Sequence, residues 1–514
     1  MSIAPLFHSI LFPVGQGSQL NEAAEPAFFR DLNLDQVVQA IVIGRREYNL
    51  EPFFYTPLQD LDSIRYRHEV FKDLESSLLL NQIKEFAQKM GKMRESLGVK
   101  KKLSNEFQKQ QWFLEAIHVY CQAINSLALT LSDTAIRSSG LSRFRDYLVN
   151  YRNSDRFSTL VNETRQLKAD LSALKYCILI DGVTLTVRKY RGESDYSAEV
   201  ERTFQKFKQG AVKDYRVKFS ESLDMNHIEA KILEFVSYLY PETFASLHTY
   251  CAKNVDYLDA MVSRFDCEIQ FYVAYLDHIE KFKRAGLQVC YPTQTDQLGK
   301  IYARQTYDLA LANKLVSRDA SIVPNSFDLN GVERVFVVSG PNQGGKTTFA
   351  RTFGQVHYLA SIGCLVPGSS AQLSVFDKLF THFERSEDMK TLRGKLQDDL
   401  IRVREIFNHA TCHSIIITNE IFTSTTMQDA TFLSEMVMKQ ILELDLLCVW
   451  VTFIDELASL DRKIVSLVST VAPDNPTSRT FKIVRKPADG LAYAMSIAEK
   501  YRLTNHQLAE RIRT

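Results

Sequence analysis

The chain has 514 residues, of which 45% are hydrophobic and 24% are charged, and its formal net charge is +1. This composition excludes a disordered chain, and the length predicts two to four domains of about 100–200 residues each. The sequence has no run of ~20 uninterrupted apolar residues and no basic region at its start, so we expect a cytoplasmic protein with no membrane partner.

The pattern of the chain divides it into a short N-terminal segment (1–60), a helical part (61–297) and a C-terminal part (298–514). In the helical part, apolar residues recur at helical spacing, for instance over 69–90 and 260–285, and glycine and proline are rare. We therefore expect long helices packed against one another.

One segment interrupts this helical pattern. Residues 177–190 alternate β-branched and apolar residues around Asp181-Gly182, a dipeptide favoured in two-residue hairpin turns. The alternation predicts a small β element, within an insertion near 177–220, set among the helices.

Two basic clusters of the helical part are candidate contacts to DNA phosphates. A neutral overall charge neither requires nor excludes a nucleic acid partner, and cations that contact phosphates do not read bases. The alternative is that both clusters are solvated surface charge. The candidates are Lys100, Lys101 and Lys102 in one cluster and Arg188, Lys189 and Arg191 in the other.

After residue 300 the pattern changes to short β-rich runs, at 335–339, 413–419 and 446–453, separated by helical segments. Such alternation is typical of an α/β nucleotide-binding domain. The sequence therefore predicts an α/β domain preceded by a mostly α-helical one.

A phosphate-binding loop is predicted directly after the first of these runs. From Gly340 to Thr347 the chain reads G-x-x-x-x-G-K-T, in which backbone N–H groups surround the phosphates, Lys346 reaches the β- and γ-oxygens and Thr347 ligates Mg²⁺. The strand before this loop and the helix after it are the context that the motif requires. We expect ATP to be bound by Gly340, Pro341, Asn342, Gln343, Gly344, Gly345, Lys346, Thr347 and Thr348.

A second chemical landmark lies at the end of the next β-rich run. Residues 415–418 form a predicted buried strand that delivers Asn419 and Glu420 to its carboxyl end, where ligands bind in parallel sheets. Glu420 and Lys346 are the predicted catalytic residues. Glu420 is expected to orient or deprotonate the attacking water. Asn419 offers a neutral oxygen to the Mg²⁺ shell, so the affinity for the metal should be weakened.

Three motifs in order resemble the ATPase domain of the MutS family: GPNQGGKTTFAR (340–351), ASIGCLVPGSSAQL (360–373) and FDKLFTHF (376–383). The resemblance implies a homodimeric ATPase of the ABC type with a phosphate loop (P-loop), in which each ATP lies between the loop of one subunit and the signature loop of the other. It also implies helical levers that grip DNA and a helix–turn–helix dimer contact at 490–512. We find no counterpart of the family's mismatch-reading domain.

The chain departs from the family pattern at three places. Asn419 replaces an acidic residue, residues 391–395 replace the Ser-Gly-Arg-Ser-Thr signature, and Phe453 replaces a histidine. The resemblance places Thr391 and Lys395 at the nucleotide in trans, where the charge of Lys395 could compensate.

Two functions follow from these departures. One is an ATP-dependent DNA-binding protein that acts on mismatched or branched DNA, in mismatch repair or a related process, with slow hydrolysis. The other is a nucleotide-gated dimerisation or interaction protein with little ATP turnover.

Overall fold

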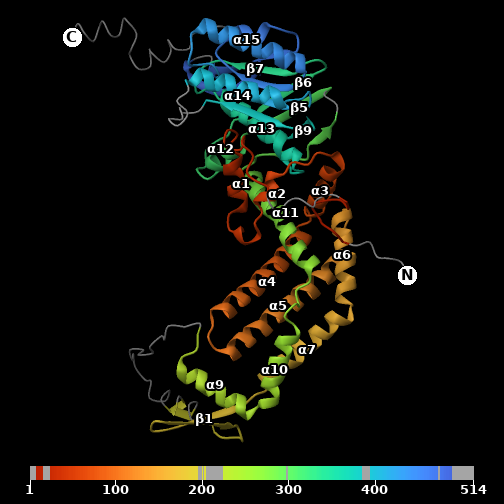
Figure 1. The fold of residues 1–514 in the computed structure, drawn as a ribbon, viewed down its shortest axis with the longest axis vertical. Coiled ribbons are helices and arrows are strands. Elements are labelled where there is room, and N and C mark those ends of the chain that lie inside the picture. Colours follow the sequence, from red (N-terminus) through yellow and green to blue (C-terminus); the bar gives the residue numbers. More distant parts are fainter. Residues whose placement is uncertain are drawn as a thin grey trace, which may run out of the picture. The chain divides into compact units, whose positions relative to one another are not determined.

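A computed structural model gives the fold of the chain (Figure 1). The structure describes residues 7–15, 23–194, 199–200, 202–203, 224–296, 299–384, 394–472 and 475–488. The expected helix–turn–helix at 490–512 and the signature residue Thr391 lie outside the described residues.

The chain packs into two units. The first, which we call the helical unit, comprises residues 1–7, 73–137 and 141–266, and the second, the sheet unit, comprises residues 8–72, 138–140 and 267–514. Residues 8–72 thus pack with the C-terminal part of the chain. The division of the sequence at residues 60 and 297 stays a prediction.

The helical unit consists of long helices and one hairpin. Apolar side chains of its first long helix are buried at helical spacing, as at Leu79, Ile83 and Phe86, and they pack against the next helix along the chain. In the part of the chain that the structure describes, no helix is long and apolar enough to cross a membrane. The elements are α4 (Ser77–Lys102), α5 (Glu106–Asp133), α6 (Ser139–Arg152), α7 (Asp155–Ser172), β1 (Tyr176–Asp181), β2 (Thr184–Lys189), α9 (His227–Leu239) and α10 (Pro241–Lys253), and α11 (Ala260–Arg284) continues into the sheet unit.

The predicted β element is an antiparallel hairpin whose turn lies one residue later than expected. Asp181 pairs with Thr184, so the two central residues of the turn are Gly182 and Val183. Gly182 has φ 61°, which suits a type II′ turn with glycine at its first central position. Gly182 therefore permits this turn type, and Asp181 is the last residue of β1 that pairs with β2.

The helical stretch predicted over 69–90 is two helices. Helix α3 (Leu61–Asp73) ends in a turn in which the Ser76 N–H donates to the Asp73 carbonyl, and α4 begins at Ser77. Ser76 has extended backbone angles and occupies the N-cap position of α4, for which serine is favoured. A helical period persists through a short turn of this kind, so apolar spacing alone does not reveal the break.

The sheet unit is built on a six-stranded sheet in the order β10-β11-β12-β7-β13-β14, with β7 between β12 and β13. Neighbouring strands are parallel from β10 to β13, and only β14 is antiparallel to its neighbour. The strands are β7 (Val335–Ser339), β10 (Leu379–Phe383), β11 (Ile415–Asn419), β12 (Leu447–Val451), β13 (Ile464–Ala472) and β14 (Asn475–Arg485). The predicted order of a helix-rich part followed by an α/β part is confirmed.

Smaller sheets and helices complete this unit. A four-stranded sheet has the order β4-β9-β5-β6, and β3 pairs with β8. These strands are β3 (Val289–Cys290), β4 (Thr293–Thr295), β5 (Lys300–Thr306), β6 (Asn325–Asn330), β8 (Val366–Pro367) and β9 (Ser370–Ser374). The helices besides α3 are α1 (Leu34–Val42), η2 (Arg46–Tyr48), α2 (Glu51–Tyr55), α12 (Leu309–Val316), α13 (Lys346–Ser361), α14 (Lys395–His409), α15 (Met427–Leu444) and η3 (Asp455–Ser459).

Helices cover both faces of the six-stranded sheet. Val335 and Val337 of β7 belong to a buried cluster shared with α14, α15 and η3. Phe336, which points to the other face, contacts Phe349 and Phe353 of α13. Alternate residues of β7 are thus buried on opposite faces, as expected for a central parallel strand.

Candidate functional site

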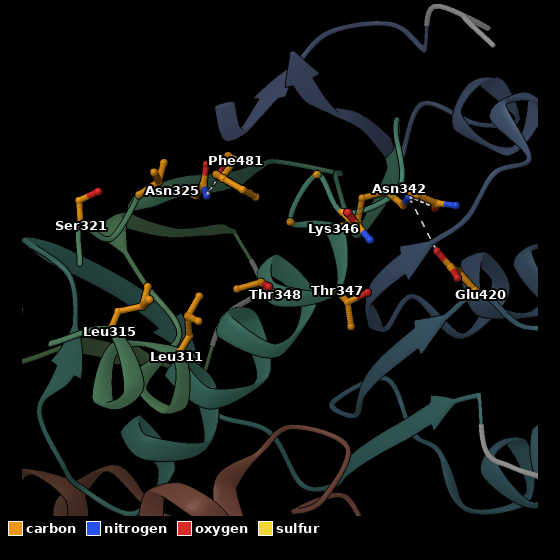
Figure 2. A pocket seen from close by; sticks show the side chains of 14 residues that line it. Leu311, Leu315, Ser321, Asn325, Asn342, Lys346, Thr347, Thr348, Glu420 and Phe481 are labelled. Atoms are coloured by element: carbon orange, nitrogen blue, oxygen red, sulfur yellow. Dashed lines mark hydrogen bonds and ion pairs between the residues drawn. The ribbon is translucent and has the colours of Figure 1, made fainter. Parts of the chain in front are cut away.

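The glycine-rich loop connects the central strand β7 to α13 and lines a pocket of ≈ 520 Å³ (Figure 2). All five residues of β7 are buried, and α13 begins at Lys346. The loop therefore lies at the carboxyl end of a parallel strand and at the N-terminus of a helix, where backbone N–H groups and the helix dipole favour an anion. The lining residues are Leu311, Leu315, Ser321, Val323, Asn325, Asn342, Gln343, Gly344, Gly345, Lys346, Thr347, Thr348, Glu420 and Phe481.

Lys346 places a buried positive charge at this pocket. Its side chain is 4% exposed, and its Nζ donates to the carbonyl oxygens of Gly340 at 3.0 Å and Pro341 at 3.3 Å. Glu420 Oε1 lies 3.8 Å from the same nitrogen. Burial lowers the pKa of Lys346, and the nearby Glu420 carboxylate partly opposes this effect. Because neutral carbonyls and one carboxylate only partly compensate a buried ammonium, the pocket favours an incoming anion.

The two strand-end residues predicted from the sequence meet the loop. Thr347 Oγ1 donates to Asn419 Oδ1 at 2.8 Å, so the hydroxyl and the amide oxygen lie side by side. Glu420 follows with φ 53°, a left-handed conformation that is uncommon for a non-glycine residue, and its N–H donates to the Val451 carbonyl. This backbone turn directs the carboxylate towards Lys346, as Figure 2 shows.

Phe453 contributes a contact that sequence reasoning did not anticipate. Its ring centroid lies 4.3 Å from Lys346 Nζ, within the range of a cation–π interaction, although the residue is 44% exposed. Phe453 follows the end of β12, whose neighbour β11 ends at Asn419. Residues that directly follow neighbouring parallel strands lie at the same edge of the sheet. The place of Phe453 just after β12 was therefore the one sequence signal that it lies near Asn419 and Glu420.

One end of the pocket is mainly apolar, although Ser321 and Asn325 also line it (Figure 2). Leu311 and Leu315 of α12, Val323 and the 49%-exposed ring of Phe481 line it. Phe481 lies in β14 with φ 57°, and Asn325 holds its backbone: Asn325 Nδ2 donates to the Phe481 carbonyl at 3.0 Å, and Asn325 Oδ1 accepts from Ile483 N at 2.9 Å. The sequence carries no local signal for this arrangement, because 156 residues separate Asn325 from Phe481.

Lys395 is the first residue of α14. Its Nζ pairs with Glu384 and lies 3.4 Å from Thr423 Oγ1. It is not among the described residues that line the pocket, which is compatible with the contact in trans implied by the motif order. That contact stays a prediction.

The basic candidates all lie in the helical unit. Lys100, Lys101 and Lys102 form the last turn of α4, where Lys100 Nζ also lies over the Phe113 ring at 4.1 Å. Arg188 and Lys189 are in β2, and Arg191 follows it. Arg188 lies 3.4 Å from Glu193, and Lys189 Nζ lies 4.9 Å from the Tyr240 ring centroid, so both cations already have partners.

Comparison with known proteins identifies the C-terminal part of the chain. Residues 336–510 match the family model of MutS domain V. This part of the chain is similar to MutS proteins. The resemblance drawn from the motifs is thereby confirmed.

The MutS proteins that the chain matches are distant relatives. The DNA mismatch repair protein MutS of Syntrophomonas wolfei is 26% identical over 281 residues, which cover 54% of this chain and 32% of that MutS. The MutS of Orientia tsutsugamushi is 28% identical over 195 residues, covering 37% of this chain and 22% of the relative. The chain thus spans about a third of the length of these MutS proteins or less.

Proposed function

We propose that the chain binds ATP at the loop between β7 and α13, as the P-loop of an ABC-type ATPase domain. The observation that carries this proposal is the buried ammonium of Lys346, held over the loop by the Gly340 and Pro341 carbonyls at the N-terminus of α13. A triphosphate would supply the negative charge that the present contacts provide only in part. Gly340 to Thr348 would cradle the phosphates.

The apolar end of the same pocket suits the base of the nucleotide. Phe481 presents an exposed aromatic ring there, and Leu311 and Leu315 lie in the facing helix α12. Base–aromatic stacking is worth about 1–3 kcal/mol per base. A pocket with a cationic loop at one end and an aromatic ring at the other matches the two ends of a nucleoside triphosphate.

Mg²⁺ fits this site as a partner of the nucleotide. Thr347 Oγ1 and Asn419 Oδ1 are adjacent neutral oxygens, which Mg²⁺ accepts as ligands directly or through water. Among the described residues no group of three or more His, Cys, Asp or Glu side chains gathers at one place. The phosphates would therefore have to supply most of the negative charge around the metal, which when bound neutralises charge on the transferred phosphoryl group.

Hydrolysis would depend on Glu420. Its carboxylate is the one acidic group among the described residues that line the pocket, and it would accept a proton from the attacking water. In the present structure it pairs with Lys346, so the phosphates must draw Lys346 away before Glu420 acts as a base. Neutral Asn419 and apolar Phe453 make slow turnover the expected outcome.

DNA mismatch repair, or a related process on mismatched or branched DNA, is the biological role that we propose. The supporting observation is the name DNA mismatch repair protein carried by the relatives. ATP would join two subunits through the P-loop of one and Thr391 and Lys395 of the other, and helical levers would then grip DNA. The basic ends of α4 and β2 are proposed phosphate contacts.

A nucleotide-gated interaction protein with little turnover is the second candidate. Asn419 and Phe453 favour this candidate. Asn419 brings no charge to the metal, and the Phe453 ring lies against the ammonium group of Lys346. Binding would then set dimerisation without a catalytic cycle.

Two measurements test these functions. Calorimetric titration with ATP and Mg²⁺ of the wild-type chain and of Lys346→Ala should show binding only, or mainly, in the wild type; no binding by the wild type would refute the nucleotide site. Turnover measured with duplex, mismatched, branched and single-stranded DNA separates the two candidates. A rate that DNA raises supports the DNA-dependent ATPase, whereas tight binding with no turnover on any DNA supports the interaction protein.

A further inference from the structure

The strand pair β13–β14, which we call the ribbon, contacts the phosphate loop through two residues other than Phe481, which lines the pocket. Ser469 of β13 is fully buried, and its Oγ donates to the Gly344 carbonyl at 2.7 Å. Arg479 Nε of β14 donates to the Asn342 carbonyl at 3.1 Å. Neither Ser469 nor Arg479 is among the described residues that line the pocket.

The contact between Ser469 and the loop is close enough to require glycine. A Cβ atom added to Gly344 would lie 2.1 Å from Ser469 Oγ, and one added to Gly340 would lie 2.9 Å from the Ser469 carbonyl oxygen. Gly340 also has φ 111°, which side-chain-bearing residues rarely adopt. Two glycines of the motif are therefore needed here for the approach of β13, in addition to any approach of phosphate.

These two hydrogen bonds determine which way the loop amides point. In a trans peptide group the N–H points opposite to the preceding carbonyl. A Gly344 carbonyl directed at Ser469 therefore turns the Gly345 N–H away from β13, towards the pocket. The Asn342 carbonyl, directed at Arg479, likewise turns the Gln343 N–H away from Arg479.

We infer that Ser469 and Arg479 are positioning residues, which hold two peptide groups of the loop with their N–H groups directed at the phosphates of the nucleotide. This inference rests on the proposed nucleotide function. The ribbon pre-organises the anion site, so that binding does not have to order the loop. The register of the β13–β14 pairing shifts between Ser469 and Val471, and Val471 pairs with Arg479.

The chain offers a matched control for the serine. Ser466 lies in the same strand, and its Oγ is buried without a hydrogen-bond partner in the described part of the structure. Ser466→Ala removes a hydroxyl that contacts no loop atom, whereas Ser469→Ala removes the one that holds Gly344. Each substitution removes one serine hydroxyl group from β13.

The test measures ATP, ADP and AMP affinity by competition against a fluorescent nucleotide, together with unfolding in the absence of nucleotide. Ser469→Ala should weaken the binding of ATP and ADP about tenfold, which is the equivalent of one buried hydrogen bond. AMP has no β-phosphate, so its affinity should equal that of the wild type. Ser466→Ala should leave all three unchanged. A general loss of structure would instead weaken all three nucleotides and lower the unfolding transition.

Arg479→Met provides the second variant, since it removes a donor to the loop and keeps the length of the side chain. It should weaken ATP and ADP at least as much as Ser469→Ala does, because a nearby charge is also lost. If Ser469→Ala binds ATP as Ser466→Ala does, the loop-holding role is refuted even if Arg479→Met is weak, because charge alone then explains the arginine. A wild-type chain that binds no nucleotide overturns the proposed function and the inference together.

Discussion

Replacing Asn419 by Asp tests whether the neutral side chain limits the proposed ATPase. Asn419 Oδ1 accepts the Thr347 hydroxyl at 2.8 Å, and an Asp oxygen can accept the same bond, so the local geometry should be retained. The substitution therefore adds one negative charge beside the oxygens that we propose for Mg²⁺ and changes little else.

The expected gain follows from Coulomb's law. Two unit charges 4 Å apart interact by about 1 kcal/mol in water, so a carboxylate and a divalent cation gain about 2 kcal/mol. The water value is used because Asn419 and Thr347 are only partly buried. Repulsion between the new carboxylate and one phosphate oxygen removes about 1 kcal/mol. The remaining ~1 kcal/mol corresponds to half-maximal turnover at a Mg²⁺ concentration about fivefold lower.

The assay is the ATPase rate as a function of Mg²⁺ concentration for the wild type and Asn419→Asp. Asn342→Asp is the matched control, because it makes the same change in the phosphate loop beside Lys346 Nζ, 3.5 Å from the Asn342 oxygen, rather than beside Thr347. We expect a lower Mg²⁺ requirement only for Asn419→Asp. An unchanged Mg²⁺ dependence with no faster turnover would show that Asn419 does not limit the site.

Three further predictions concern the charge of the loop, the base and the buried histidines. Lys346→Ala should weaken ATP binding at least tenfold in calorimetry, because hydrogen bonds to charged groups are worth about 1.5–3 kcal/mol; unchanged affinity would contradict the P-loop assignment. Glu420→Gln should retain ATP and lose turnover, since an amide cannot accept a proton from water; equal rates would assign the base elsewhere. Burial lowers the pKa of His68 to about 4, of His278 to about 3 and of His357 to about 4, below the ordinary value of 6.5. The unfolded chain therefore binds more protons, and the free energy of unfolding should fall as the pH drops from 6.5 to 4, by about 3 kcal/mol for one such shift; a denaturation midpoint that is constant over this range would refute the assignment.

The loop and the strand ends could be predicted because their signals are local. The G-x-x-x-x-G-K-T spacing lies within eight residues, and the buried runs before it and before Asn419 are short and apolar. Parallel strands place such ends on one edge of a sheet, so the meeting of Thr347 with Asn419 followed from the pattern. Phe453 also follows a parallel strand and lies at the same edge of the sheet. Its contact with Lys346 depends on the position of the ring, which the spacing of residues in the sequence does not specify.

The ribbon and the aromatic end of the pocket could not be predicted in the same way. Ser469, Arg479 and Phe481 reach the site through an antiparallel pairing with register shifts, and a shift of one residue exchanges the faces of a strand. The left-handed backbone conformation at Phe481 could not be predicted either, because the residue there is not glycine. These residues are placed by pairing and by the side chain of Asn325, both of which are properties of the folded chain.

The N-terminal residues show how long-range contacts decide the packing of the sheet unit. Gln355 of α13 donates to the Leu32 carbonyl at 2.8 Å, and Tyr358 donates to the Phe54 carbonyl at 2.8 Å. Residues 8–72 therefore pack against the helix that begins at the phosphate loop. No periodicity in the first 60 residues of the sequence indicates this partner.

The same helix links the loop to two other helices through contacts within the sheet unit. Just beyond the C-terminal end of α13, Arg67 of α3 donates to the Ile362 carbonyl at 2.7 Å, and Tyr275 of α11 donates to the Leu365 carbonyl. Arg67 is fully buried, so a shift of this end would break hydrogen bonds that water cannot replace. Under the proposed function, a displacement of α13 by nucleotide would reach α3 and α11 through these packed contacts. The coupling requires that α13 have two positions with different nucleotide affinity, because a ligand shifts a conformational equilibrium only by its differential affinity for the two states.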